Sequence, residues 1–141
     1  FPQYKEKLCS YDRRRGMSRR RVALGERGEK AALQFFEDLG YQLLEANYRN
    51  RSAEADLILQ DGENLVFCEV KTKVDLASGH AAESYGKTQQ RRLRRLILSY
   101  LARTDWQGPI RIDLLALQRE KPGQDYQLYH FIDALTLEDN W

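Results

Sequence analysis

Two short segments that flank a glycine-containing turn constrain the fold of this chain most. Residues 54–60 and 65–71 lie on either side of Gly62-Glu63, and both segments are rich in the branched apolar residues that favour strands. A short loop that contains glycine between two such runs is typical of a β-hairpin. We therefore expect two adjacent antiparallel strands, and the position of the turn predicts which residues face each other.

The predicted register places charged and apolar residues on different parts of the hairpin. A loop centred on Gly62-Glu63 sets Asp56 opposite Glu69 and Ile58 opposite Phe67, because cross-strand partners are counted outward from the loop. Side chains alternate between faces with a period of two, so these four share one face. The other face is apolar and suited to packing under a helix, with Ala55, Leu57 and Leu59 against Val66, Cys68 and Val70.

The remaining pattern predicts two helices and further strands. Apolar residues at helical spacing indicate helices at residues 28–39 and 87–103, and residues 74–86 show no regular pattern. Strand-like runs occupy residues 41–48, 111–117 and 126–132, and a short helical turn is expected from Asp133. A helix between two strands is typical of a parallel crossover. The order predicts a mixed α/β sheet with helices packed against it.

Charge divides the chain into two parts. The length of 141 residues suits one compact domain, which we place at residues 25–141. Residues 1–24 are basic with little apolar content, which predicts a flexible arm attracted to polyanions or, alternatively, a solubilising tail. No segment has the length and apolarity of a membrane helix or a secretory signal. We therefore expect a cytoplasmic protein without a membrane role.

The opposed carboxylates of Asp56 and Glu69 suggest a metal site. Directly opposed side chains have Cβ atoms about 4.5–5.5 Å apart, where like charges destabilise the strands unless a cation lies between them. Mg²⁺ or Mn²⁺ prefers such carboxylate oxygens. Lys71 follows on the same face and can orient a water molecule or stabilise charge developing on a phosphate. The alternative is a solvent-exposed hairpin end where Lys71 offsets Glu54.

Glu29 is a further acidic candidate. Its spacing from Ala32 and Phe36 places it on the inward side of the helix predicted at residues 28–39, where an acid is unusual. The alternative is a carboxylate at a helix N-terminus, a position that the helix dipole favours.

An ordered series of motifs resembles the YraN-like family of predicted endonucleases. That family is similar to archaeal Holliday junction resolvases and belongs among the PD-(D/E)xK nucleases. The resemblance covers about residues 22–135 and is carried by G25-E-R-G-E29-K-A-A, Gly40-Tyr41, Asn47-Tyr48-Arg49, A53-E-A-D-L-I58, L65-V-F-C-E-V-K-T72 and R111-I-D113.

The resemblance implies an αβββαβ core like that of restriction endonucleases, together with a set of site residues. Asp56 matches the metal-binding aspartate of the motif, Glu69 the second acid, Lys71 the lysine and Glu29 the glutamate of the first helix. The expected cofactor is Mg²⁺ or Mn²⁺, bound by the three acids. By analogy with resolvases, a homodimer is also expected.

This chain departs from the family pattern at a few positions. Ala53-Glu54-Ala55-Asp56 stands where the family usually has G-E-I-D, and Cys68 replaces a usual valine. Gln89 stands where a lysine is common near the start of the second helix, and Lys87 lies half a turn away. The acids and Lys71 are retained.

The helix predicted at residues 87–103 is basic and contains no acid. Such a helix either binds phosphates, which gives affinity without sequence readout, or is only a solvated surface. The expected nucleic-acid-binding residues are Lys87, Gln89, Arg91, Arg92, Arg94 and Arg95.

Two functions follow from the sequence. The first is a metal-dependent endonuclease that hydrolyses phosphodiester bonds in DNA, including branched or structured DNA. The alternative is a non-catalytic nucleic-acid-binding module that keeps the nuclease fold.

Overall fold

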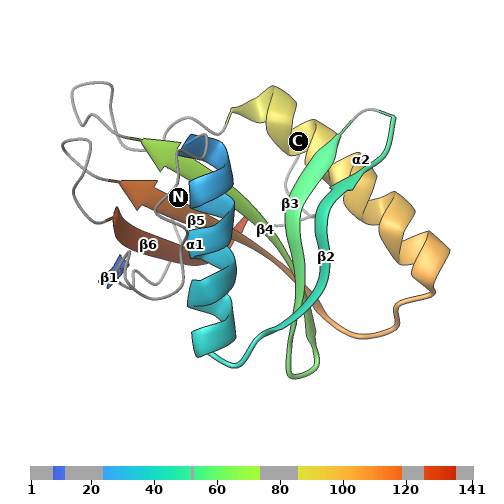
Figure 1. Cartoon of the computed structure of the whole chain (residues 1–141). Helices are drawn as coiled ribbons and strands as arrows, with labels where there is room; N and C mark the ends of the chain where they lie inside the picture. Colours follow the sequence, from blue (N-terminus) through green and yellow to red (C-terminus); the bar gives the residue numbers. More distant parts are fainter. Residues whose placement is uncertain (1–7, 12–23, 52, 74–85, 119–125, 136–141) are drawn as a thin grey trace.

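The computed structural model describes residues 8–11, 24–51, 53–73, 86–118 and 126–135. They form six strands and two helices (Figure 1). In chain order these are β1 (Leu8–Tyr11), α1 (Leu24–Asp38), β2 (Gln42–Arg49), β3 (Glu54–Asp61), β4 (Asn64–Lys73), α2 (Lys87–Thr104), β5 (Ile110–Gln118) and β6 (Tyr126–Leu135).

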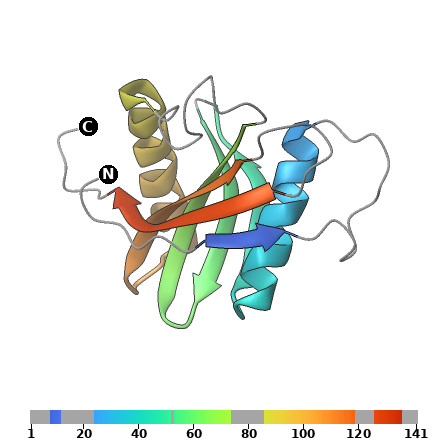
Figure 2. The same cartoon turned by 90° about the vertical axis from the view of Figure 1, so that its left-hand side faces the viewer.

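The strands form one mixed sheet with a helix on each face. Their order is β1-β6-β5-β4-β3-β2, in which β4 and β5 are parallel and all other neighbours are antiparallel. In Figure 2 the sheet lies between α1 and α2. The predicted mixed α/β sheet and its parallel crossover through the second helix are thus confirmed. Neither described helix has the length and apolarity needed to cross a bilayer.

The hairpin of β3 and β4 has the predicted register. Ile58 pairs with Phe67, and the ladder closes at Asp61 and Asn64 around the loop. Gly62 has a φ of 59°, a conformation that glycine adopts at little cost. The turn residue therefore selects the register, and the register decides which side chains share a face.

Both faces of the sheet carry an apolar core. Against α1 lie Leu57, Leu59, Val66 and Cys68, as the alternation predicts, and α1 contributes Ala31, Ala32, Phe35 and Phe36. Against α2 lie Ile58, Leu65, Phe67 and Ile112, and α2 contributes Leu93, Leu96, Ile97 and Tyr100. Burial of each large apolar side chain contributes about 1.5–3 kcal/mol. The hairpin is therefore held from both sides.

Three predicted details of the secondary structure are corrected. Helix α1 begins at Leu24, four residues before the predicted start at residue 28. Strand β6 runs to Leu135, where a helical turn was predicted from Asp133. Asp133 has a φ of 56° and its N–H donates to Asp113, so this residue bends a strand instead of starting a helix. Within the basic segment, residues 8–11 form β1, which pairs with β6.

The face predicted for Ala55 is also wrong. Ala55 packs with the cluster under α2, whereas the alternation placed it with Leu57 and Leu59 on the α1 side. The β3–β4 ladder extends only from Asp61 to Leu57, so Ala55 is paired with Tyr48 of β2 but has no partner in β4. The pairing predicted across the hairpin therefore does not hold at Ala55.

A buried polar cluster ties β5 to β6 on the α1 side. The Asp113 carboxylate accepts hydrogen bonds from Arg111 at 2.8 and 2.9 Å, from His130 at 2.8 Å and from the Asp133 N–H at 2.9 Å. Burial alone would raise the pKa of Asp113, but these hydrogen bonds together hold it below its usual value. Arg111 also contacts Asp61 and Tyr41.

We expect Asp113→Asn to destabilise the fold by about 3–5 kcal/mol, because it leaves the Arg111 guanidinium without its buried counter-charge. Asp61→Asn is the matched control. The Asp61 side chain is 40% exposed, so removing its ion pair with Arg111 should cost less than about 1 kcal/mol. Urea unfolding of both variants measures the difference. Equal losses would contradict a special role for Asp113.

Because its pKa is lowered in the fold, Asp113 contributes stability above about pH 4, where the unfolded chain also ionises. That stability is lost as the pH falls from about 4 toward the lower pKa of the folded state. The wild type should therefore approach the stability of Asp113→Asn in acid, and a constant gap would contradict this assignment.

Candidate metal centre

The acid pair lies where β3 separates from β4. Asp56 is in β3 and Glu69 is in β4, directly beyond the last ladder pair of Leu57 with Cys68. The Asp56 carboxylate accepts the Val70 N–H at 2.8 Å through Oδ2. A side chain thus takes over the bond that a strand neighbour would provide. This bond orients Asp56 toward β4 and holds it beside Glu69.

The two carboxyl groups influence each other's ionisation. Burial, followed by the nearby Asp56 charge, raises the pKa of Glu69 well above its usual range. Burial also raises the pKa of Asp56, against the hydrogen bond from the Val70 N–H, which lowers it. Two acids held this close in a buried place do not both ionise easily in the absence of a cation.

One buried oxygen of Glu69 lacks a hydrogen-bond partner in the described part of the chain. The side chain is 8% exposed, and no described residue forms a hydrogen bond with Oε1. Such a buried polar atom is costly unless a ligand satisfies it. Among the described residues, no three His, Cys, Asp or Glu side chains form a ready ligand cluster. Mg²⁺ is commonly held by one or two carboxylates with waters and substrate phosphates, so the Asp56–Glu69 pair fits this ion.

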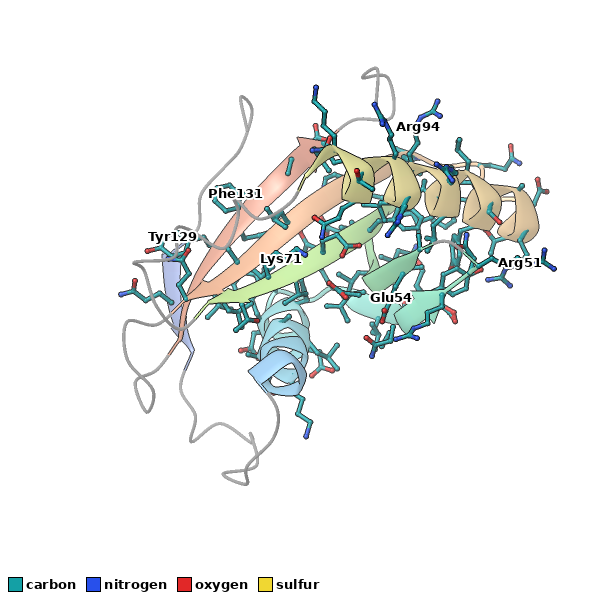
Figure 3. All side chains as sticks on the ribbon, turned by 90° about the horizontal axis from the view of Figure 1, so that it is seen from above. Arg51, Glu54, Lys71, Arg94, Tyr129 and Phe131 are labelled. Carbon is teal, nitrogen blue, oxygen red and sulfur yellow. The ribbon has the colours of Figure 1, made fainter. Side chains whose placement is uncertain are left out.

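Lys71 lies beside the pair, as predicted. It is half-buried on β4, two residues beyond Glu69, and its charge lowers the pKa of both acids. Across the sheet it aligns with Ala116 of β5 and then Tyr129 of β6. Figure 3 shows Lys71 on β4, with Tyr129 and Phe131 farther along the sheet. The two aromatic residues pack against the cluster of Leu114, Ala116 and Ala134.

The predictions for two further acids, Glu29 and Glu54, have different outcomes in the structure. Glu29 lies in α1, but its side chain is outside the described part of the structure, so its role as a third ligand stays a prediction. Glu54 was predicted to face Lys71, yet the β3–β4 ladder does not reach that far. Glu54 instead pairs with Arg49 of β2 and forms a 3.2 Å ion pair with it. Its charge raises the pKa of Asp56 and Glu69, so it lies near the pair.

The predicted basic helix is present, and its role in binding nucleic acid stays a prediction. The five cations predicted to bind nucleic acid are exposed on α2, namely Lys87, Arg91, Arg92, Arg94 and Arg95. The Gln89 side chain accepts the Gly86 N–H at 3.0 Å and so caps the start of α2. Figure 3 places Arg94 and Arg51 on opposite sides of α2. Arg51 lies close to α2 in the fold but was not among the predicted site residues, because its neighbours on α2 are distant in the chain.

We expect Glu69→Gln to stabilise the metal-free protein at pH 8 by about 1–2 kcal/mol. Glu69 has a raised pKa in the fold, so its contribution falls as the pH rises from about 4.3, where an unfolded glutamate ionises, toward the higher folded value. A glutamine keeps the shape, avoids the buried charge and can donate to Asp56. Thermal unfolding in EDTA measures the gain.

The control for this measurement is Glu63→Gln, which makes the same change on the exposed hairpin loop and should leave stability unaltered. The gain from Glu69→Gln should also shrink as the pH approaches 4. A Glu69→Gln protein that is less stable than the wild type at pH 8 would contradict the assigned cost of this carboxylate.

We also expect Mn²⁺ binding to release a proton below the raised pKa of Glu69, because a carboxylate must be ionised to hold the ion. Affinity should therefore rise about tenfold per pH unit below the raised pKa of Glu69. Isothermal titration in two buffers with different ionisation enthalpies measures the released proton. An affinity that does not change between pH 5 and 8 would count against the pair, and Asp56→Asn should abolish binding.

Comparison with known proteins identifies the family. Residues 28–117 match the model of the uncharacterised protein family UPF0102. A UPF0102 protein of Herpetosiphon aurantiacus is 42% identical over 123 residues, which cover 84% of this chain and 97% of that protein. A UPF0102 protein of Symbiobacterium thermophilum is 44% identical over 113 residues, covering 79% and 91%. The chain therefore belongs to the UPF0102 family, in agreement with its YraN-like motifs.

Proposed function

We propose that this protein is a metal-dependent endonuclease that hydrolyses phosphodiester bonds in DNA. One observation carries the proposal. The carboxyl groups of Asp56 and Glu69 lie together where β3 separates from β4, and among the described residues Glu69 Oε1 is buried without a hydrogen-bond partner, close to Lys71. Two hard oxygen donors and a nearby cation are the groups that phosphodiester hydrolysis requires.

Each site residue has a distinct part in this proposal. Asp56 and Glu69 would hold the divalent ion in their ionised forms, and the Val70 N–H keeps Asp56 in place. A bound Mg²⁺ or Mn²⁺ supplies a Lewis acid that polarises the phosphate and lowers the pKa of a water molecule. Lys71 stabilises the negative charge that develops on the phosphate oxygens.

The element order also supports the proposal. The series α1, β2, β3, β4, α2, β5 is the αβββαβ order implied by the resemblance to PD-(D/E)xK nucleases. In this arrangement α2 connects two parallel strands, and its first turn lies at the end of the sheet where β4 finishes (Figure 1). The basic helix therefore begins on the same side of the molecule as Lys71. This proximity favours a polyanionic substrate.

The alternative is a nucleic-acid-binding module without turnover. It would keep the same fold and the same basic helix. The observation that favours it is Gln89, which replaces a lysine common in the family and is engaged in capping α2. The two functions differ only in whether bound DNA is cut. Cleavage therefore decides between them, and resolvase-like enzymes suggest that four-way junctions and a dimeric state belong in the test.

We expect the protein to cut DNA only with Mg²⁺ or Mn²⁺. The assay offers duplex, single-stranded, flap and four-way junction DNA to the wild type and to Asp56→Ala, Glu69→Ala and Lys71→Ala. Removing either acid should abolish metal binding and cleavage. Lys71→Ala should slow cleavage about 10²–10³-fold while Mn²⁺ affinity changes less than about threefold, because Lys71 acts on the developing charge.

Glu63→Gln serves as the control and should cut at the wild-type rate, since it is exposed on the far end of the hairpin. Circular dichroism verifies that each variant is folded. If the wild type binds Mn²⁺ yet cuts none of these DNAs, or if Asp56→Ala cuts as well as the wild type, the endonuclease proposal is wrong and the binding module takes its place.

A further inference from the structure

A cavity lined by arginines lies between the β2–β3 connection and the first half of α2. Its volume is about 510 Å³, within the range of about 300–1,000 Å³ typical of ligand pockets. We call it the arginine pocket. Its lining residues are Arg51, Thr88, Arg91, Arg92 and Arg95.

Helical geometry explains why these residues gather. Successive residues of a helix are rotated by about 100°, so positions 88, 91, 92 and 95 fall within one arc of α2. The buried residues Leu93, Leu96, Ile97 and Tyr100 occupy the opposite arc. Arg94 lies outside the arc of the pocket, and Figure 3 shows it across the helix from Arg51. The basic helix thus has one face that meets the β2–β3 connection.

The arginine pocket has an excess of positive charge. Within the described ranges, none of its four arginines forms an ion pair with an acid, and the first turn of α2 contains no acidic residue. Four guanidinium groups that face one cavity repel each other in the absence of an anion. The helix N-terminus adds to the positive potential. An anionic ligand of at least two charges removes this repulsion.

We propose that the arginine pocket binds consecutive phosphate groups of a nucleic-acid strand. The proposal rests on the proposed function, because it assigns the pocket to the strand presented to Asp56 and Glu69. Guanidinium groups bind phosphate oxygens in a bidentate manner, and the Thr88 hydroxyl donates a further hydrogen bond. Among the described residues, the pocket lining contains no aromatic or apolar side chain on which a base stacks. The strand is therefore held by its backbone, without sequence preference.

The location of the arginine pocket is suited to this role. Arg51 and Asp56 belong to one short stretch of chain, and an extended stretch of this length spans at most about 18 Å. Bases of a DNA strand are spaced by about 3.4 Å along the duplex axis. A strand held in the pocket therefore has a phosphate at the carboxylate pair within about five base steps. The pocket sets how far from the anchored phosphates the cut falls.

The test measures DNA binding in EDTA, so that metal binding and cleavage do not contribute. Fluorescence anisotropy compares single-stranded and duplex DNA bound to the wild type, Arg51→Ala, Arg92→Ala and Arg94→Ala. Arg94→Ala is the matched control, because it removes the same charge from the same helix at a position that does not line the arginine pocket. Each pocket substitution should weaken binding about tenfold and reduce the salt slope by about one, whereas Arg94→Ala should weaken it less than about threefold.

A second measurement uses tripolyphosphate as the probe. It should raise the unfolding temperature of the wild type and of Arg94→Ala, but not that of Arg51→Ala combined with Arg92→Ala. Circular dichroism shows whether this double variant is folded, and the single variants repeat the comparison. Oligonucleotides with a 5′-phosphate or a 5′-hydroxyl separate the two phosphate sources. If the wild type binds both oligonucleotides equally well, the pocket holds internal phosphodiesters. If the pocket substitutions weaken binding of the 5′-phosphorylated oligonucleotide alone, the pocket holds a terminal phosphate.

Three results would contradict the proposed role of the arginine pocket. The first is an equal loss of DNA affinity in Arg51→Ala and Arg94→Ala, and the second is the absence of DNA binding by the wild type. The third is competition by polyglutamate as strong as that by DNA, which would indicate that the pocket binds an acidic peptide. Failure of the proposed function has a different signature. In that case DNA binding in EDTA still depends on Arg51 and Arg92, while Mn²⁺ binding or cleavage is missing.

Discussion

The hydrogen bond from the Val70 N–H to Asp56 Oδ2 lies where β3 leaves β4, and the candidate site depends on it. The ladder between β3 and β4 ends with Leu57 and Cys68, so the part-buried Val70 N–H needs an acceptor other than the β3 backbone. The Asp56 carboxylate fills this need and is thereby fixed next to Glu69. The same strand separation opens the space in which two carboxyl groups lie together.

Holding two acids in a buried place has a free-energy cost that the rest of the fold must offset. This cost arises from desolvation and from repulsion by Asp56, and the raised pKa of Glu69 reflects it. Stabilising interactions lie on both sides of the site. Helix α2 packs Leu96 and Ile97 over the hairpin, and on the other face Asp113 joins β5 to β6 through Arg111 and His130. A cation bound by the pair would convert the local repulsion into attraction, which is why such a site gains stability from its ligand.

The hairpin shows which features were predictable from the sequence. The turn at Gly62 and the alternating segments around it predicted the pairing of Ile58 with Phe67, because a tight turn leaves few alternative registers. Local rules failed where long-range contacts compete. Ala55 changed face where the ladder ends, and Asp133 bends β6 through a bond to Asp113, a residue distant in the chain. Strand β1 is too short to show an alternating pattern of apolar and polar residues. It is a strand because it pairs with β6, which is distant in the chain.

The sequence by itself determined the fold class, the common face of Asp56, Glu69 and Lys71, and the basic character of α2. Period and turn chemistry are local properties, and they act within a few residues. Only the tertiary structure decided that Asp56 is held by the Val70 N–H, that Glu69 Oε1 has no partner among the described residues, and that Arg51 joins three arginines of α2 around one cavity. These features arise between segments that are remote in the chain, where packing and burial, not local periodicity, set the distance between charges.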